Sequence, residues 1–189
     1  MPVTLLDDRT AVVLIDLQKG ITALPTAHPA AEVVANAARL AGAARERGLP
    51  VVRVRVAFSP DGGDVLRART DAPGPAIAPA PDFAEYDERV PDGPTDIAIT
   101  KRGWDAFHGT ELDLQLRRRK IAGIVLAGIS TSIGVESTAR GARERGYEIA
   151  VASDAVTDLV ASAHENALGV ILPRIAQIDT TESIIAAFV

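Results

Sequence analysis

Two charged side chains of this sequence stand directly after apolar, strand-like runs, a place where acid–base chemistry is common. Asp16 follows AVVLI, and Lys101 follows IAIT. A carboxyl group at the end of a buried strand is partly desolvated, which raises its pKa and suits it to carry a proton, unless a cation keeps it ionised. A lysine at the same cleft can pair with that carboxylate, stabilise a developing anion or hold a substrate carboxylate. If Asp16 stood alone, an Asp that closes a turn would be the favoured interpretation.

A third candidate is the stretch GISTSIG, residues 128–134, which follows an apolar run and leads into a predicted helix. The free amides at such a helix start bind carboxylates or oxyanions. An N-capped helix with no special role is the alternative. Trp104 and Phe107 come shortly after Lys101 and are expected either as pocket walls or as ordinary core.

A mostly parallel sheet would bring these residues together, and the sequence predicts one. Six strand-like runs alternate with helical segments, which indicates an α/β domain whose sheet is covered on both faces. Ligands of such sheets bind beyond the carboxyl ends of the strands. Alternation of arginine and valine in the second run predicts a strand near the edge. The runs are 10–16, 49–58, 95–101, 121–129, 147–154 and 177–179, and the helical segments are 29–48, 110–120, 132–145, much of 162–177, and 180–188.

Residues 59–94 interrupt this alternation, because Pro, Gly, Ala and Asp dominate there and predict little regular structure. Long segments of this kind are often lids over active sites. A solvated surface excursion without a role is the alternative. The 189 residues are expected to form a single domain, 1–189, around one core.

Composition excludes several kinds of chemistry. The chain has no cysteine, so it has neither a thiolate nucleophile nor a cysteine-ligated metal. Its net charge of −5 argues against nucleic acid as a partner, and the basic run 117–120 is expected to close a helix. The apolar runs are too short to cross a membrane. No secretory signal is evident at the N-terminus, and a cytoplasmic location is expected.

The order of these motifs resembles the isochorismatase-like hydrolase superfamily over about residues 10–181. The resemblance rests on DLQ at 16–18, K-x-x-W-x-x-F-x-x-T-x-L from Lys101, and GISTSIGVESTARGARERGY at 128–147. It implies a Rossmann-like three-layer α/β/α fold with a six-stranded, mostly parallel sheet. Amidases of this superfamily use Asp, Lys and Cys, which align with Asp16, Lys101 and Gly134. Because position 134 is glycine, only its backbone amide is available there, and thioester chemistry is excluded.

Isochorismatases of the superfamily also carry glycine at this position. In their mechanism the Asp protonates an enol-ether carbon, water adds, and pyruvate departs. The resemblance therefore implies Asp16 as general acid, Lys101 as its electrostatic partner, and a small, anionic metabolite as substrate. The residues that it places around the substrate are Gln18, Trp104, Phe107, Ile129, Ser130, Thr131 and Ile133.

This sequence departs from the isochorismatase pattern at two places. Ser130 stands where isochorismatases tend to have an aromatic residue, and the Gln and Arg that follow their second strand have no clear equivalent in AFSPDGGD. Arg67 or Arg69 are possible substitutes from the loop. The resemblance further implies a non-proline cis peptide at Ile129–Ser130 and a homo-oligomer, either a dimer or a tetramer.

No metal or other cofactor is expected. The D-x-H motif that holds a divalent ion in nicotinamidases is missing after the second strand. The three histidines, His28, His108 and His164, are far apart along the chain and lack ligand spacing. His164, on a predicted helix, is expected to be structural.

Two other functions remain open from the sequence. One is a binding or regulatory protein that keeps the pocket but has lost catalysis. The other is an amide or ester hydrolase that uses a hydroxyl of Ser130, Thr131 or Ser132 as nucleophile. A hydroxyl nucleophile needs an adjacent base.

Overall fold

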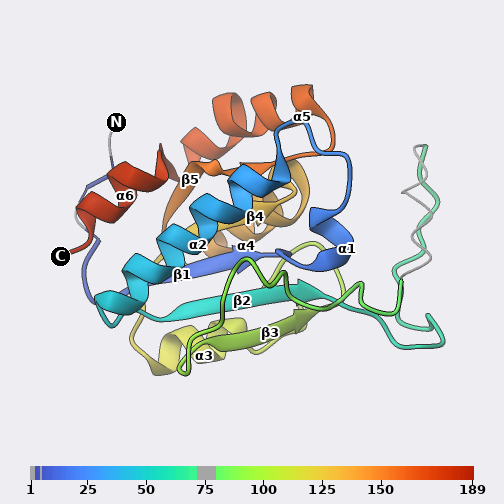
Figure 1. The fold of residues 1–189 in the computed structure, drawn as a ribbon, viewed down its shortest axis with the longest axis horizontal. Helices are drawn as coiled ribbons and strands as arrows, with labels where there is room; N and C mark the ends of the chain where they lie inside the picture. The colour runs from blue at the N-terminus through green and yellow to red at the C-terminus, as the bar shows by residue number, and fades with distance from the viewer. Residues whose placement is uncertain (1–2, 5, 72–79) are drawn as a thin grey trace.

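A six-stranded parallel sheet runs through the centre of the protein in the order β3-β2-β1-β4-β5-β6 (Figure 1). The structure is a computed structural model that describes residues 3–4, 6–71 and 80–189. The predicted α/β fold is confirmed. The strands are β1 (Thr10–Ile15), β2 (Val51–Val56), β3 (Ile97–Lys101), β4 (Gly123–Ile129), β5 (Glu148–Thr157) and β6 (Gln177–Asp179).

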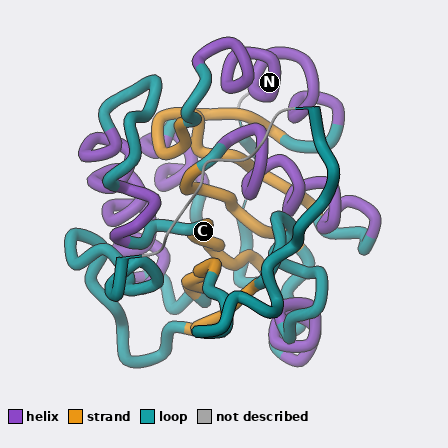
Figure 2. Tube along the Cα trace, turned by 90° about the vertical axis from the view of Figure 1, so that its right-hand side faces the viewer, coloured by secondary structure: helices purple, strands orange, loops and turns teal. Residues whose placement is uncertain are grey.

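Helices cover both faces of the sheet (Figure 2). One face packs against α2 and α6, and the other packs against α3 and α4. The helices are α1 (Lys19–Thr22), α2 (Ala30–Glu46), α3 (Leu112–Arg118), α4 (Glu136–Glu144), α5 (Ala161–Asn166) and α6 (Thr181–Ala187). Shorter turns are the π-helices η1 (Thr131–Val135) and η2 (Ala167–Ile171) and the 3₁₀-helix η3 (Leu172–Arg174).

The sequence of β1 explains why it lies in the middle of the sheet. All six of its residues are buried. Val13 and Ile15 contribute to the core beneath α3 and α4, whereas Val12 and Leu14 contribute to the core beneath α2. A strand that is apolar on both faces must be covered on both faces, and helices that connect parallel strands provide that cover.

β2 lies near the edge of the sheet, as its arginines predict, because its outer neighbour β3 is the edge strand. Its arginines bind the chain that crosses over it, because Arg53 donates to the carbonyl of Val90 and Arg55 donates to the carbonyl of Ala84. Arg53 also lies 4.1 Å from the ring centroid of Tyr86. The alternation therefore reflects a covering segment.

Two predicted helices are broken in the structure. The helix expected over 132–145 begins as η1 and continues as α4, and the one expected within 162–177 is split into α5, η2 and η3. Pro173 lies inside η3 and has no amide hydrogen to continue an α-helix. In the described parts of the segment 59–94, neither a helix nor an extended strand forms. Among the described residues, no helix has the length and hydropathy needed to span a membrane.

Candidate active site

Asp16 and Lys101 meet at the carboxyl ends of the strands, although β2 separates the strands that carry them. The Nζ of Lys101 lies 2.8 Å from Oδ2 of Asp16. Both residues are buried, with exposed fractions of 6% for Asp16 and 1% for Lys101. The same Nζ donates to the carbonyl oxygen of Trp104 at 2.7 Å. The ammonium group therefore links the acid to the segment that follows β3.

Only one oxygen of the Asp16 carboxyl group has a partner. Oδ1 is buried and accepts no hydrogen bond, and it is the one such side-chain atom in the described part of the chain. Burial raises the pKa of Asp16 to about 6, against the opposing attraction of Lys101. The backbone of Asp16 is left-handed, with φ of 52°, a conformation that Asp tolerates better than most residues. This turns the chain sharply after β1.

A close contact between β1 and β4 shapes the turn that faces the acid. Gly128 pairs with Ile15 and has φ of 129°. A Cβ at Gly128 would lie 2.0 Å from the carbonyl oxygen of Ile15, so no side chain fits there. The peptide bond between Ile129 and Ser130 is cis, as expected from the sequence. The main chain then enters η1, which carries Gly134 toward Asp16.

Gly134 lies directly against the charged pair. A Cβ built on Gly134 would be 3.2 Å from Oδ2 of Asp16 and 3.2 Å from Nζ of Lys101. It would also be 2.8 Å from Cγ2 of Ile15, closer than side chains pack. The space beside Gly134 is thus too small for a side chain. Any side chain at position 134 would have to displace Ile15 and would contact the Asp16–Lys101 pair closely.

Buried side chains hold η1 from behind. Oγ1 of Thr131 lies 2.8 Å from Nδ1 of His164. The amide and the hydroxyl of Ser132 both donate to Asp158, at 2.7 and 2.8 Å. The rings of His28 and His164 stack with centroids 4.7 Å apart, so these histidines are neighbours in space despite their separation in sequence. Burial, together with His28, lowers the pKa of His164, which fits a structural role.

A cavity of about 310 Å³ opens over this arrangement. Most of its walls are apolar, and its polar floor is formed by the Asp16–Lys101 pair. Trp104 forms part of the rim and is 64% exposed. Of the residues predicted from the sequence, seven line the cavity: Asp16, Lys101, Trp104, Ile129, Ser130, Ile133 and Gly134.

Three residues predicted to contact the substrate lie elsewhere. Phe107 is buried in the core against Tyr147, because it faces the sheet and not the strand ends. Thr131 is fully buried behind the turn and pairs with His164. Gln18 is also fully buried, and its amide group is occupied by backbone partners.

Several residues that line the cavity lie outside the sequence motifs and were not predicted. Phe58, Val65, Leu66 and Phe83 line the cavity from the segment that follows β2, and Leu159 lines it from the segment after β5. An apolar residue inside a Pro- and Gly-rich segment is the available signal, since solvated loops have little use for Phe or Leu. The segment from Phe58 to Phe83 thus contributes to the site at its described ends.

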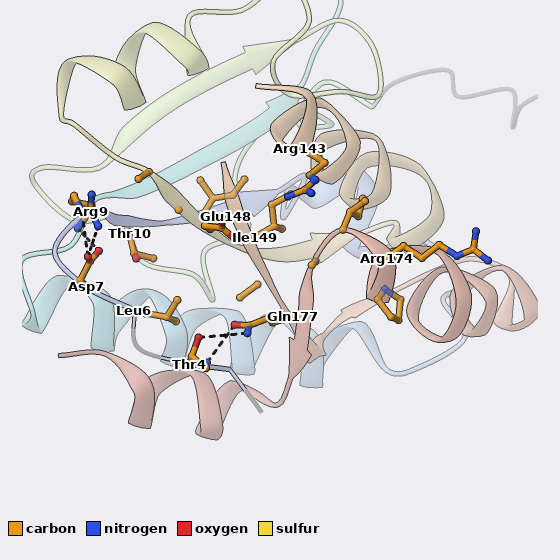
Figure 3. A pocket seen from close by; sticks show the side chains of 17 residues that line it. Thr4, Leu6, Asp7, Arg9, Thr10, Arg143, Glu148, Ile149, Arg174 and Gln177 are labelled. Atoms are coloured by element: carbon orange, nitrogen blue, oxygen red, sulfur yellow. Dashed lines mark hydrogen bonds and ion pairs between the residues drawn. The ribbon is translucent and has the colours of Figure 1, made fainter. Parts of the chain in front are cut away.

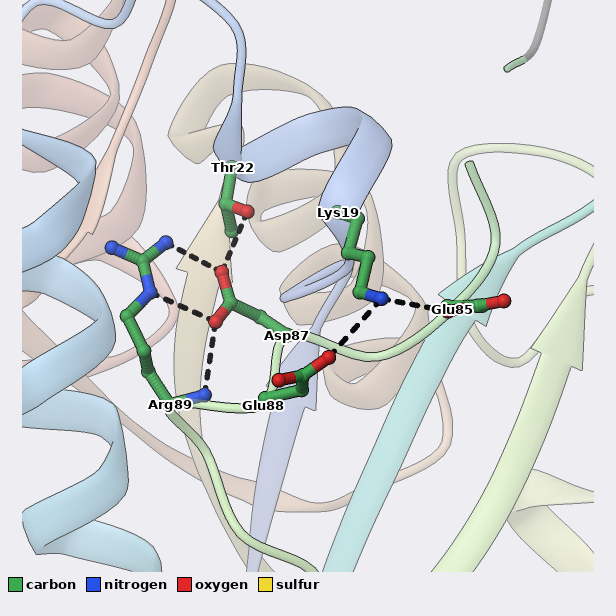
Figure 4. Close-up of polar contacts among 6 residues, drawn as sticks. All are labelled: Lys19, Thr22, Glu85, Asp87, Glu88 and Arg89. Atoms are coloured by element: carbon green, nitrogen blue, oxygen red, sulfur yellow. Dashed lines mark hydrogen bonds and ion pairs between the residues drawn. The ribbon is translucent and has the colours of Figure 1, made fainter. Parts of the chain in front are cut away.

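Ion pairs fasten the chain that follows Phe83 to α1 (Figure 4). Lys19 pairs with Glu85 at 2.8 Å and with Glu88 at 3.2 Å. Asp87 accepts from Thr22 and from Arg89, and the Arg89 guanidinium holds the pKa of that carboxyl below its usual range. This segment is therefore anchored over the end of β1, which keeps Phe83 in the cavity wall.

Gln18 is the central clamp of this region, so its replacement should weaken the fold. Its Nε2 donates to the carbonyls of Val56 and Phe83, and its Oε1 accepts from the amide of Val56 at 2.8 Å. Gln18→Ala removes all three hydrogen bonds, and among the described residues only the carbonyl of Phe83 keeps another partner, the amide of Gly20. We expect the free energy of unfolding to fall by about 2–3 kcal/mol in urea denaturation. Asn36→Ala, which removes two exposed hydrogen bonds, is the control and should change it by less than about 0.5 kcal/mol. Equal losses in the two variants would contradict the clamp.

A second cavity, of about 430 Å³, opens at the amino ends of the strands, near the start of β4 and β5 (Figure 3). Its charged side chains do not converge on a reacting centre. Arg9 pairs with Asp7, and Arg174 points away from the cavity. No buried unpartnered group lies among its described lining residues. In the described part of the chain, the buried unpartnered oxygen lies at the Asp16 cavity instead.

Comparison with known proteins gives the family. The isochorismatase domain model matches residues 10–183. The chain belongs to the isochorismatase family. It is 47% identical to the uncharacterised isochorismatase family protein YecD of Escherichia coli O157:H7, over 94% of this chain and 95% of that one.

Structures and enzymes of the isochorismatase family support the same assignment. An isochorismatase family protein from Burkholderia thailandensis superposes with a TM-score of 0.93 at 43% identity, covering 98% of both chains. A ureidoacrylate amidohydrolase, RutB of Agrobacterium fabrum, is 30% identical over 84% of this chain and 80% of its own length. The chain is a hydrolase of this family.

The histidines do not extend the site into a metal centre. Among the described residues, no three His, Asp or Glu side chains are grouped so that they could hold an ion. The stacked pair of His28 and His164 is engaged by Thr157 and Thr131 instead.

Proposed function

We propose that this isochorismatase-family hydrolase cleaves a vinyl ether without a covalent nucleophile, with Asp16 as the general acid. The observation that carries the proposal is the unpartnered, buried Oδ1 of Asp16. Lys101 occupies Oδ2, so the carboxyl group has one oxygen free for a proton and its transfer. A pKa near 6 places the acid close to the pH at which a general acid works well.

The proposed reaction is hydrolysis of an enolpyruvyl ether. Protonated Asp16 gives its proton to the terminal carbon of the double bond, and positive charge develops on the ether carbon. The Asp16 carboxylate, held by Lys101, stabilises that charge and then accepts a proton from the attacking water. Collapse of the hemiketal transfers the hydroxyl proton to the leaving oxygen, which releases an alcohol and pyruvate. Ser130 and the main chain of the turn line the side where the substrate carboxylate would bind.

A hydroxyl nucleophile has less support. Ser130 lines the cavity, but its hydroxyl forms no hydrogen bond with a base among the described residues. Thr131 has a base in His164, yet it is fully buried outside the cavity. The hydroxyl of Ser132 donates to Asp158, which also binds the Ser132 amide. None of the three combines a base with access to substrate.

The alternative of a pocket that binds without catalysis also has less support. A buried carboxyl group with one unsatisfied oxygen is costly to keep, and a binding site has no need of its raised pKa. The glycine at position 134 is fitted to the closed pair, which argues against a recently emptied cysteine position. If Gly134→Cys gave amidase activity in a protein that releases no pyruvate, the non-catalytic alternative would be favoured.

The pH dependence tests the proposed role of Asp16. Because the acid must be protonated, kcat/KM for pyruvate release should be level below pH 6 and fall about tenfold per unit above the pKa of about 6. The measurement is pyruvate release from isochorismate and from 2-methoxyacrylate between pH 5 and 8, corrected for the uncatalysed rate. An activity that rises with pH would require Asp16 to act as a base first, and no pyruvate from either compound would refute vinyl-ether cleavage.

A further inference from the structure

The acid-bearing cavity continues outward into a wider hollow of about 860 Å³. The two share five apolar walls, namely Phe58, Val65, Leu66, Phe83 and Trp104. One groove therefore extends from Asp16 to the surface, between residues 57–67 on one side and residues 80–84 on the other. The compact, proton-transferring part of the site uses only its inner end.

The walls where the two hollows meet are unusually apolar for a surface. Leu66 is 76% exposed and Trp104 is 64% exposed, and adjacent large apolar side chains left open to water mark binding sites. Two charged groups beside these walls are paired, because Lys101 pairs with Asp16 and Arg102 pairs with Asp64 at 2.7 Å, whereas Asp61 and Arg67 line only the outer hollow. Such walls favour an apolar ligand group over a hydrated one.

The groove is also fixed in position relative to the acid. The ammonium group of Lys101 holds both Asp16 and the carbonyl of Trp104. Phe83 packs so closely on α1 that a Cβ at Gly20 would lie 2.0 Å from its ring. Trp104 and Phe83 are thus held in position relative to the proton donor, as a substrate longer than the inner cavity would require.

We propose that the outer hollow binds the apolar alcohol portion of the substrate, so that the enzyme hydrolyses enolpyruvyl ethers of apolar alcohols. The inference rests on the proposed function, since it orients the ether with its double bond at Asp16 and its alkoxy group along Leu66 and Trp104. Water is consumed, and the products are pyruvate and the apolar alcohol. A small polar alcohol would leave the walls of the outer hollow in contact with water.

A homologous series of substrates tests this inference. With 2-methoxy-, 2-butoxy- and 2-hexyloxyacrylate, kcat/KM for pyruvate release should rise about fourfold for each added methylene that the groove covers. Leu66→Ser should flatten this rise because it removes a wall without disturbing the core. Leu114→Ser, at a 54% exposed leucine on α3, is the matched control and should leave the series unchanged. A flat series in the wild type, or a rise that Leu66→Ser does not change, would overturn the inference.

A binding measurement separates this inference from the proposed function. Trp104 is the single tryptophan of the chain, so its fluorescence reports on the groove directly. The saturated 2-methoxy-, 2-butoxy- and 2-hexyloxypropanoates cannot be protonated at a double bond and serve as probes. Affinity that increases with chain length, and does so less in Leu66→Ser, supports the groove even if no acrylate is hydrolysed, in which case vinyl-ether cleavage alone fails. Affinity that is independent of chain length overturns the groove.

Discussion

Replacement of Asp16 by asparagine is expected to lower kcat/KM for pyruvate release by about 10²–10⁴-fold, the range that a positioned general acid contributes. Asparagine has nearly the same shape but carries no transferable proton. It also removes the negative charge that opposes Lys101. In the wild type, deprotonation of Asp16 causes kcat/KM to fall above pH 6. The residual kcat/KM of Asp16→Asn should therefore no longer fall tenfold per pH unit above pH 6. The measurement is the pH profile of pyruvate release from 2-methoxyacrylate.

Two controls make this result specific. Asp7→Asn changes an exposed carboxylate just before β1, at the far end of the sheet, and should leave kcat/KM as in the wild type. Binding of 2-methoxypropanoate, followed by Trp104 fluorescence, should persist in Asp16→Asn if the variant is folded. Activity of Asp16→Asn within a few-fold of the wild type would show that the proton comes from another group.

The sequence predicted the ends of the strands well because buried parallel strands have a strong pattern. A continuous run of branched residues such as β1 must be covered on both faces. A charged residue directly after it has to lie at the carboxyl ends of the strands. Asp16, Lys101 and the turn at Gly134 were therefore found from local sequence, and their convergence followed from the topology.

The cavity walls could not be predicted in the same way, because they depend on contacts between distant segments. Phe58 and Phe83 belong to a region without periodicity. Phe83 is brought over β1 by Gln18, by main-chain hydrogen bonds from Lys19 and Gly20, and by the ion pairs of α1. Phe107 shows the opposite case. Its motif position near Lys101 suggested a wall, yet the turn after β3 directs it into the core. Periodicity identifies a strand end, but it does not tell which way a loop side chain faces.

The same limit applies to the arginines of β2 and to the histidines. Arg53 and Arg55 indicated a strand near the edge, where β2 does lie, but they did not indicate that they bind a segment more than 25 residues further along the chain. The ring centroids of His28 and His164 are 4.7 Å apart, although the spacing of these residues in the sequence excludes any local motif. Tertiary partners that arrive from far along the chain leave no mark on local spacing.

The second large effect concerns stability, and it should depend on pH. Lys101→Met removes the cation beside a buried carboxyl group, and losing one partner of a buried pair costs about 3–5 kcal/mol. The folded-state pKa of Asp16 already lies above its ordinary value of 3.8, so deprotonation of Asp16 favours unfolding as the pH rises. Without Lys101 this pKa rises further. The loss of unfolding free energy should therefore be near its full size at pH 8 and fall to about 1 kcal/mol or less at pH 5, where Asp16 is protonated in both proteins.

Urea denaturation at pH 5 and pH 8 measures this difference, and two further variants define its cause. Lys19→Met removes an exposed lysine from its pairs with Glu85 and Glu88, and should give a far smaller loss that is the same at both pH values. Asp16→Asn/Lys101→Met removes both charges, and should be within about 1 kcal/mol of the wild type at pH 8, because neutral groups of similar shape replace a buried pair at little cost. A pH-independent loss in Lys101→Met would mean that lost packing, and not an uncompensated carboxylate, is responsible.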